Sequence, residues 1–211
     1  MECWTAEEAQ RFIAVAHKSI YGPIWSLALL TGMRKGELLG LRWQDIDFEA
    51  GVLHVRQTVG ALHGKTEYKK PKTARSRRDI DLADGILAVL RAHKTRQSTR
   101  RLELGPRWQD HDLVFPSTVG TPVNPDNCDQ DFNRLIKKAG VKLIRIHDTR
   151  HSYATLAILN GIPINVVSQS MGHGDISTTL RTYAHVMPEQ NRELARKMGS
   201  LLLLPDAASV R

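Results

Sequence analysis

Apolar side chains recur every three to four residues over most of the chain, a spacing that is typical of amphipathic helices. Near the start, Thr5 and Glu8 form a capping-box pattern ahead of an apolar stretch that includes Phe12. The first helix is therefore predicted to begin almost at once. Further helices are predicted over 24–30, from residue 34 onward, and over 84–101, 125–139, 148–160, 163–170, 176–182 and 188–203.

The pattern of residues changes after the third predicted helix and becomes typical of β-strands. Residues 43–48, a turn at 49–51 and the β-branched segment 52–59 together predict a hairpin. Alternating positions over 78–82 predict a third, edge-like strand after a cationic segment that contains Pro71. We find no internal repeat and nothing that marks a second domain. The predicted fold class is α+β, mostly helical, with a small three-stranded antiparallel sheet.

Composition places the chain among ordinary globular proteins. Of its 211 residues, 41% are hydrophobic and 25% are charged, which supplies enough apolar side chain for one core and excludes collagen-like, disordered and membrane-spanning classes. Lysine and arginine number 30 against 22 acidic residues. The resulting net charge of +8 favours a polyanionic partner, nucleic acid before membrane.

The two cysteines and the chain ends indicate the compartment. Cys3 and Cys128 are far apart and form no CxxC pattern, so neither a disulfide framework nor a thiolate zinc site is expected. The amino terminus lacks the basic and apolar regions of a signal peptide, and the apolar run 201–204 is too short to span a bilayer. We expect a cytoplasmic protein in a reducing compartment.

The segment 60–66, GALHGKT, is similar to a nucleotide-binding P-loop but has one residue too few between its glycines. A P-loop also needs a helix directly after its threonine, so that backbone N–H groups meet the phosphates. Here Pro71 follows in a strand-like context. We interpret the segment as a hairpin turn.

His147 and His151 could share one face of a helix, as two zinc ligands of a metalloprotease do. The residue after the first histidine is Asp148, however, where the general base is expected to be glutamate. Arg150, between the two histidines, would place a fixed cation beside the metal. A zinc site is therefore not favoured. A generic DNA-binding helix in the basic stretches of the chain stays open as an alternative.

Several further motifs are weak alone, because a surface arginine or a single histidine is most often without a functional role. In combination they are far more specific. The motifs are 31–43 (TGMRKGELLGLRW), 71–73 (PKT) leading to Ile80, 147–151 (HDTRH), and 171–173 (MGH) with 177–179 (STT) and 183–185 (YAH). With these boxes in this order, about residues 3 to 200 resemble the catalytic domain of a tyrosine recombinase of the phage-integrase type. Thr149 and Met171 stand where that family often has leucine, a change that repacks the core without touching the chemistry.

The resemblance implies a reaction. A tyrosine hydroxyl attacks a DNA phosphodiester and gives a 3′-phosphotyrosyl link and a free 5′-hydroxyl, and a 5′-hydroxyl of another strand then reverses the step. Because bond energy is conserved, the reaction needs neither ATP nor a metal, and we expect no cofactor. The lack of an intact P-loop and of a carboxylate cluster suited to magnesium in the sequence agrees with this expectation.

The resemblance also implies a set of catalytic residues. They are Arg34, Lys72, His147, Arg150, His173 and Tyr183. The two arginines would stabilise the dianionic phosphorane, because guanidinium groups stay charged and present paired donors. His147 lies three residues before Arg150, so both project from one helix face, and it suits a hydrogen bond or proton acceptance from the nucleophile, Tyr183. His173 would donate a hydrogen bond to a non-bridging phosphate oxygen.

Lys72 would be the general acid for the departing 5′-oxygen. Lys69 and Lys70 are its rivals for that role, and with Arg75 they are otherwise expected to contact DNA phosphates. Glu37 follows the first catalytic arginine by one helical turn and is expected to orient it.

The resemblance extends to domain organisation and assembly. Residues 1–200 would form the catalytic domain and 201–211 a C-terminal tail, with the N-terminal core-binding and arm-binding domains of such integrases absent from this chain. Double-stranded DNA is the expected partner, and no membrane is expected. The full-length protein would act as a homotetramer on DNA and the isolated chain would associate weakly, its C-terminal helix docking on a neighbouring protomer or packing in cis.

The leading hypothesis for function is a site-specific DNA recombinase, an integrase, that integrates or excises a mobile element. Two alternatives stay open: a recombinase-like DNA-binding or accessory module without strand exchange, and a type IB topoisomerase-like strand-passing enzyme. The intact catalytic set favours an enzyme, because a module that only binds DNA has no physical need for the tyrosine.

Overall fold

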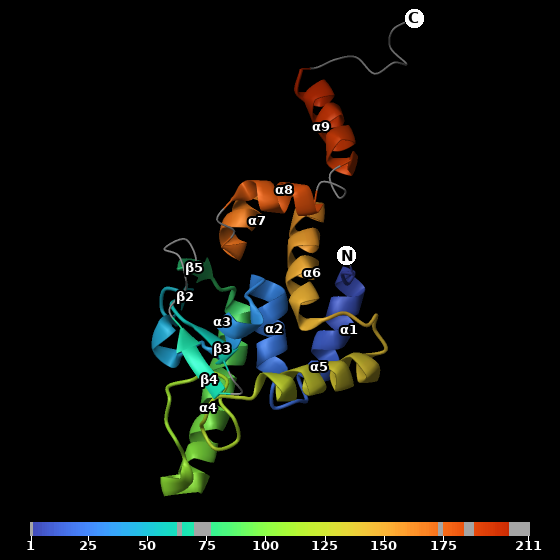
Figure 1. Cartoon of the computed structure of the whole chain (residues 1–211). Helices are drawn as coiled ribbons and strands as arrows, with labels where there is room; N and C mark the ends of the chain where they lie inside the picture. Colours follow the sequence, from blue (N-terminus) through green and yellow to red (C-terminus); the bar gives the residue numbers. More distant parts are fainter. Residues whose placement is uncertain (1, 63–64, 70–76, 173–174, 184–187, 203–211) are drawn as a thin grey trace, which may run out of the picture.

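Helices make up most of the chain, as the sequence pattern predicts (Figure 1). The computed structural model describes residues 2–62, 65–69, 77–172, 175–183 and 188–202. Its α-helices are α1 (Ala6–Ala16), α2 (Gly22–Thr31), α3 (Lys35–Leu39), α4 (Asp84–Leu104), α5 (Pro125–Ala139), α6 (Ile146–Leu159), α7 (Ile164–Met171), α8 (Ile176–Tyr183) and α9 (Pro188–Leu201). Short 3₁₀ helices, η1 (Trp43–Asp45) and η3 (Gly105–Arg107), join some of these elements.

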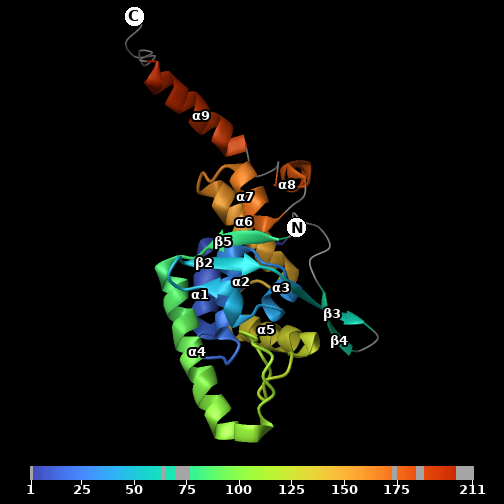
Figure 2. The ribbon, with the colours of Figure 1, turned by 90° about the vertical axis from the view of Figure 1, so that its left-hand side faces the viewer.

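The strands of the described residues form two separate antiparallel sheets. The strands β1 (Ile46–Asp47), β2 (Val52–Val55) and β5 (Arg78–Asp81) make the predicted three-stranded sheet, in the order β1-β2-β5. Leu53 lies opposite Ile80, and both are buried, so one face of this sheet packs on the core. The strands β3 (Thr58–Leu62) and β4 (Lys65–Lys69) pair with each other and project from the body of the molecule (Figure 2).

Some predicted boundaries are wrong in this region. The predicted strand over 52–59 is divided, because the chain leaves the first sheet after Val55 and pairs with β4 instead. The first half of the predicted strand over 43–48 is the 3₁₀ helix η1, and only Ile46–Asp47 form a strand. The turn of η1 is held by Asp45, which accepts hydrogen bonds from Arg42 at 2.7 and 3.0 Å and forms an ion pair with Arg56 at 3.9 Å. The segment 60–66 runs through β3 and β4, so a strand stands where a P-loop needs a helix.

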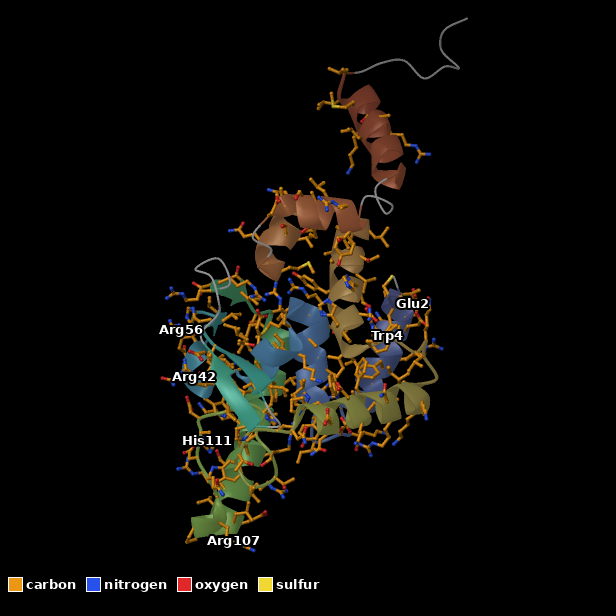
Figure 3. The ribbon with its side chains drawn as sticks, viewed as in Figure 1. Glu2, Trp4, Arg42, Arg56, Arg107 and His111 are labelled. Atoms are coloured by element: carbon orange, nitrogen blue, oxygen red, sulfur yellow. The ribbon has the colours of Figure 1, made fainter. Side chains whose placement is uncertain are left out.

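A large hydrophobic cluster fills the space between α1, α2, α5 and the three-stranded sheet. Its centre is aromatic: Phe132 of α5 lies 5.2 Å from Phe12 and 4.9 Å from Trp25, between ring centroids. All of α2 except Leu30 is buried, which makes it the central helix. Trp4 joins this cluster and its indole N–H donates to the Lys142 carbonyl at 2.7 Å, which ties the start of the chain to the approach to α6 (Figure 3).

A small hydrophobic cluster lies where α6, α7 and α8 meet. Its buried members are Ala154, Ile158, Val167, Met171 and Tyr183. The first turn of α6 belongs to the large cluster through Ile146, so α6 runs from one cluster to the other. In both views α7 and α8 lie at the end of α6 away from α5, and α9 projects beyond them (Figures 1 and 2). None of the described helices is long and apolar enough to cross a membrane.

Helix caps explain where α1 and α6 begin. The predicted capping box of α1 is confirmed, since Thr5 and Glu8 bond to each other's backbone N–H. Helix α6 begins at Ile146, two residues earlier than predicted, because Asp148 reaches back to the backbone N–H of Arg145 at 3.0 Å and caps the first turn. Asp148, the residue after His147, is therefore fixed by the helix start.

Candidate active site

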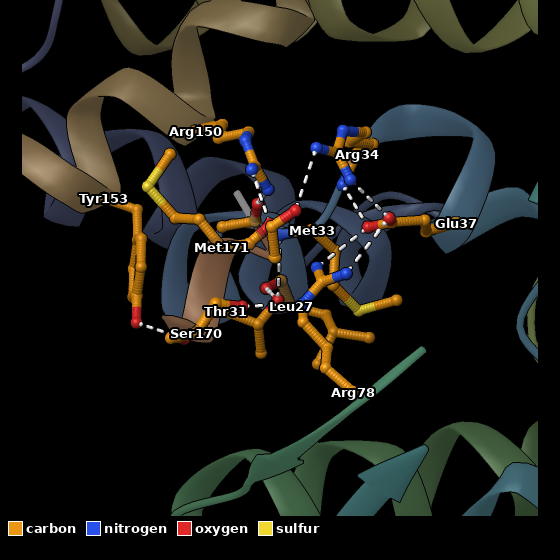
Figure 4. A network of polar contacts seen from close by, with 12 residues as sticks. Leu27, Thr31, Met33, Arg34, Glu37, Arg78, Arg150, Tyr153, Ser170 and Met171 are labelled. Carbon is orange, nitrogen blue, oxygen red and sulfur yellow. Dashed lines mark hydrogen bonds and ion pairs between the residues drawn. The ribbon is translucent and has the colours of Figure 1, made fainter. Parts of the chain in front are cut away.

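A buried carboxylate, Glu37 of α3, joins two arginines (Figure 4). Arg34, the N-cap of α3, donates its backbone N–H and its Nη1–H to Glu37, both at 2.9 Å. Arg78, the first residue of β5, donates two further hydrogen bonds at 3.1 and 2.9 Å. Burial raises the pKa of the Glu37 carboxyl, but the hydrogen bonds and charges of Arg78 and then of Arg34 more than reverse this, so the pKa lies below its usual value. Glu37 is thus ionised and hydrogen-bonded to Arg34.

Three successive backbone carbonyls at the end of α7 each accept a hydrogen bond from a different arginine (Figure 4). Arg78 Nε donates to Ser170 O at 2.6 Å, Arg150 Nη2 to Met171 O at 2.5 Å, and Arg34 Nη2 to Gly172 O at 3.5 Å. The last carbonyls of a helix carry partial negative charge, which attracts cations. Helix α7 therefore gathers guanidinium groups from α3, α6 and β5 at one point.

Arg150 is anchored on both sides. Arg150 is only 2% exposed. Its Nη1–H donates to Gly32 O at 2.6 Å, while its Nη2–H donates to Met171 O of α7. Burial, followed by the charges of Arg34 and Arg78, lowers the pKa of Arg150 to about 9, so the group still carries its charge at neutral pH. Gly32 ends α2 at φ +61°, and a Cβ there would lie 2.5 Å from the Tyr153 ring, so glycine is required where Arg150 is received.

Tyr183, at the end of α8, is almost fully buried at 1% exposure. Its hydroxyl lies 2.7 Å from Nδ1 of His151 and is hydrogen-bonded to it. Burial raises the pKa of Tyr183 to about 12, against the opposing charge of Arg150. The hydroxyl is therefore protonated at neutral pH, and it needs a proton acceptor to become a nucleophile.

His147 and His151 stack along α6, with ring centroids 5.2 Å apart in an edge-to-face arrangement. Burial is the main cause that lowers the pKa of each imidazole. The charge of Arg150 lowers the pKa of His147 further, and the positive charge that His147 carries when protonated lowers the pKa of His151 further. Both rings are neutral at pH 7. In this structure the hydrogen bond to the Tyr183 hydroxyl is made by His151, one turn further along the helix than His147, for which the sequence predicts that role.

The Asp148 carboxylate, next to His147 in the chain, is bound by Arg145. Its carboxylate accepts three hydrogen bonds from Arg145, each at 3.0 Å, from the backbone N–H and from the guanidinium. Among the described residues, no group of three or more histidine, cysteine or acidic side chains lies together as metal ligands would. The role of Asp148 is to cap α6.

The structure thus brings Arg34, Glu37, His147, Arg150 and Tyr183 into one region, from three elements: α3 with its N-cap, α6 and α8. Lys70, Lys72, Arg75 and His173 lie outside the described residues, and Lys69 lies in β4 with its side chain undescribed. Sequence reasoning gave no role to Arg78 or to His151. A signal existed for both: Arg78 lies two residues before the inward-facing Ile80, and His151 lies one helical turn after His147.

The geometry agrees with a comparison against known protein families. The sequence model of the phage integrase family matches residues 3–190. The chain belongs to the phage integrase family. This confirms the family inferred from the sequence motifs, and the matched region contains every residue of the site.

Individual relatives of this integrase-family chain are moderately similar. A tyrosine recombinase XerC-like protein of Caldanaerobacter subterraneus subsp. tengcongensis is 30% identical over 215 residues, which cover 96% of this chain and 55% of the relative. The ICEBs1 integrase of Bacillus subtilis is 31% identical over 204 residues, with 96% and 55% covered. The chain therefore spans about half the length of the curated relatives it matches.

Solved structures confirm the fold. The crystal structure of XerA recombinase is similar with a TM-score of 0.73 and 25% identity, covering 94% of this chain and 65% of that one. The Tn1549 transposon integrase in complex with transposon right end DNA has a TM-score of 0.78 at 22% identity, covering 94% and 66%. At that identity the second likeness concerns the fold alone, which is the predicted tyrosine-recombinase catalytic-domain fold.

Proposed function

We propose that this chain is the catalytic part of a site-specific DNA recombinase that cleaves and rejoins strands through a 3′-phosphotyrosyl intermediate. The observation that carries the proposal is the hydrogen bond between the buried Tyr183 hydroxyl and His151, one residue from the anchored guanidinium of Arg150. Such a reaction would integrate or excise a mobile element, in agreement with the names of the integrase relatives.

The arginines supply the charge that the reaction needs. A phosphodiester under attack becomes a dianionic phosphorane, and fixed guanidinium groups stabilise it without having to reorganise. Arg34 and Arg150 are tied to Glu37 and to the backbone of α2 and α7, so their positions are set before DNA arrives. Their role is to bind the non-bridging oxygens of the scissile phosphate.

The proposed step balances as follows. A bond forms between Tyr183 Oη and phosphorus, and the bond from phosphorus to the 5′-oxygen breaks. The tyrosine proton passes to His151 Nδ1, and the departing 5′-oxygen takes a proton from Lys72, the expected general acid. His147 and His173 would complete the hydrogen bonding around the phosphate. The reverse step uses the same groups in the opposite direction.

Double-stranded DNA is the proposed substrate, and a homotetramer on DNA is the proposed assembly of the full-length protein in the cytoplasm. The net charge of +8 supports a polyanionic partner. Leu194, Met198 and Leu201 form an apolar stripe along α9, and all three are exposed. A stripe of this kind supports a protein contact of α9 in the assembly.

Covalent trapping tests the proposal. The chain is incubated, without metal or nucleotide, with nicked duplexes from a randomised pool, and a denaturation-resistant protein–DNA adduct is sought. We expect an adduct with the parent and with Tyr21→Phe, a matched tyrosine of the large-cluster side, and none with Tyr183→Phe. The released strand should carry a free 5′-hydroxyl, shown by labelling with a kinase.

The outcomes separate the candidate functions. An adduct that persists in Tyr183→Phe, or none from a parent chain that still binds the duplex, contradicts strand cleavage by this chain and favours a DNA-binding or accessory module. An adduct that reseals only its own strand, with no product joined to a second duplex, identifies a topoisomerase-like enzyme. Sequencing the captured DNA begins to define the site.

A further inference from the structure

Arg78 is a third arginine of the site and carries no role in the reaction described above. It opens β5, its side chain is only 7% exposed, and it lies 41 residues along the chain from Glu37, to which it is bound. Three of its donor groups are directed to two different elements: Nη1 and Nη2 to Glu37 of α3, and Nε to Ser170 O of α7. One buried guanidinium therefore bridges the two supports of Arg34.

The carboxylate of Glu37 is shared evenly between the two arginines. Oε1 accepts from Nη1 of Arg34 and from Nη1 of Arg78, while Oε2 accepts from the Arg34 backbone N–H and from Nη2 of Arg78. A two-pronged bond from a rigid guanidinium fixes the plane of a carboxylate. The Arg78 fork thereby sets the direction in which Glu37 Oε1 holds the Arg34 side chain, which is itself 40% exposed and would otherwise turn freely.

The second contact of Arg78 fixes the end of α7. Its Nε–H donates to Ser170 O, and the next two carbonyls, of Met171 and Gly172, accept from Arg150 and Arg34. The fit is close, because a Cβ on Gly172 would lie 3.0 Å from Arg78 Nη1. A shift of Arg78 would move the carbonyls that receive both proposed phosphate-binding arginines.

Direct contact between Arg78 and the phosphate is disfavoured by the same geometry. The side chain is buried, and its Nε, Nη1 and Nη2 atoms all have partners within the protein. A lysine could balance the charge of Glu37 but could not reach two oxygens of one carboxylate and a carbonyl of another helix at once. The shape of arginine, and not its charge alone, is what the site uses.

We propose that Arg78 is a positioning residue for the recombination reaction: through Glu37 and through the end of α7 it sets the guanidinium of Arg34 for the scissile phosphate. This rests on the proposed function. A displacement of a catalytic group by about 1 Å slows a reaction on the order of 10²-fold, which is the size of effect expected when the fork is lost.

The first test measures single-turnover adduct formation at saturating nicked duplex. The variants are Arg78→Lys, Arg78→Gln and the control Arg77→Gln, which removes the same charge from the exposed neighbouring residue. We expect both Arg78 variants to form adduct on the order of 10²-fold more slowly, with unchanged DNA affinity, and the control to match the parent. We also expect Arg78→Lys to recover the melting temperature of the parent but not its rate. A lysine variant that recovers both contradicts the proposal, because charge balance alone would then suffice.

A double-variant cycle tests the route through Glu37. If Arg78 acts on Arg34 through Glu37, the variant that combines Arg78→Gln with Glu37→Gln loses much less rate than the product of the two single losses. Independent, multiplying losses would contradict that route.

An activity-free measurement keeps this inference separate from the proposed function. Nitrogen-15 relaxation of the arginine Nε–H groups reports how ordered each side chain is. In Arg78→Gln we expect the order parameter of Arg34 to fall, while that of Arg42, held by Asp45 elsewhere, stays unchanged. An Arg34 that remains as ordered as in the parent overturns the inference, whether or not the parent cleaves DNA.

Discussion

The cationic half and the nucleophilic half of the site rest on hydrophobic clusters of very different size. Arg34 and Glu37 are flanked by Met33, Leu38 and Leu39, which are buried in the large cluster together with the aromatic centre. The tyrosine belongs to the small cluster, which has five buried members in the part of the chain that the structure describes. Only α6 runs through both clusters among the helices that carry the site, and it holds the two histidines and Arg150 at the crossing.

The difference indicates which half is free to move. Apolar burial stabilises roughly in proportion to the area removed from water, so the small cluster opens at a lower free energy than the large one. Tyr183 is nearly fully buried, so a DNA phosphate can reach its hydroxyl only after the elements around it shift. We therefore expect the arginines to be held in place before DNA binds, and Tyr183 to become accessible only after the small cluster opens.

The largest effect is expected at the contact that joins the two halves. His151→Phe and His151→Asn should each slow adduct formation by about 10²–10⁴-fold, since neither side chain can take the Tyr183 proton. Asparagine places an amide close to the position of Nδ1 and can keep the hydrogen bond. The measurement is the single-turnover rate, with the exposed His111→Asn as the matched control.

The asparagine variant decides between two roles. If it restores the parent rate, His151 only holds the tyrosine, and the proton goes elsewhere. If both variants are slow, the imidazole is the acceptor. In that case the parent rate should also fall as pH drops below the pKa of His151, which burial holds below its usual value.

The second effect concerns the large cluster. Phe132→Ala should lower the free energy of unfolding by about 3–5 kcal/mol, because the ring packs against Phe12 and Trp25 and leaves a cavity. Urea denaturation measures this, and Leu102→Ala, at an exposed position of α4, should leave stability nearly unchanged. A loss near zero would show that the aromatic centre does not anchor the cationic half.

Most of the fold follows from periodicity, but the division between sheets does not. The β-branched run 52–59 is equally suited to one long strand or two short ones. Thr58 and Val59 join the second sheet because they pair with Lys69 and Tyr68 of β4, and the sequence around residues 58 and 59 does not specify these partners. The three-stranded sheet and the helices of the site were predictable because each has its own local pattern.

Residues of the candidate site could be predicted where they stand in a sequence motif. They could not be predicted where their contacts depend on how distant elements pack together. Arg34, Arg150 and Tyr183 stand in recognisable boxes. The alternation of β5 could place Arg78 on the inward face beside Ile80, but nothing local identifies Glu37 as its partner. Likewise the choice of His151 over His147 depends on how α8 docks on α6, which is a tertiary contact.

A smaller effect tests whether the small cluster opens independently. Ile158→Val and Ile24→Val remove the same methyl group from buried sites in the small and the large cluster. Each should cost about 0.5–1.5 kcal/mol. By amide hydrogen exchange, the first should act mainly on the opening of α7 and α8, and the second on global unfolding. Equal protection of α8 and α2 amides in the parent would contradict separate opening.

The smallest effect expected is the dependence of stability on pH. His93 lies on the large-cluster side, where burial lowers its pKa although its Nε2 is hydrogen-bonded to Val114 O at 2.7 Å; the pKa values of His147 and His151 are lowered as well. A base with a folded-state pKa below the unfolded value stabilises the fold fully above about pH 6.5 and loses this contribution as pH falls through the folded pKa.

Urea denaturation at about pH 7.5 and about pH 5.5 should therefore show lower stability at the lower pH, before the carboxyl of Glu37 begins to titrate, since its pKa is held below about 4.5. His93→Gln keeps a donor for the Val114 carbonyl and removes the titrating ring, so its stability should fall less over the same interval. If the variant falls as steeply as the parent, the loss arises at the site histidines. The pH-sensitive half of the molecule would then be the one that holds the tyrosine.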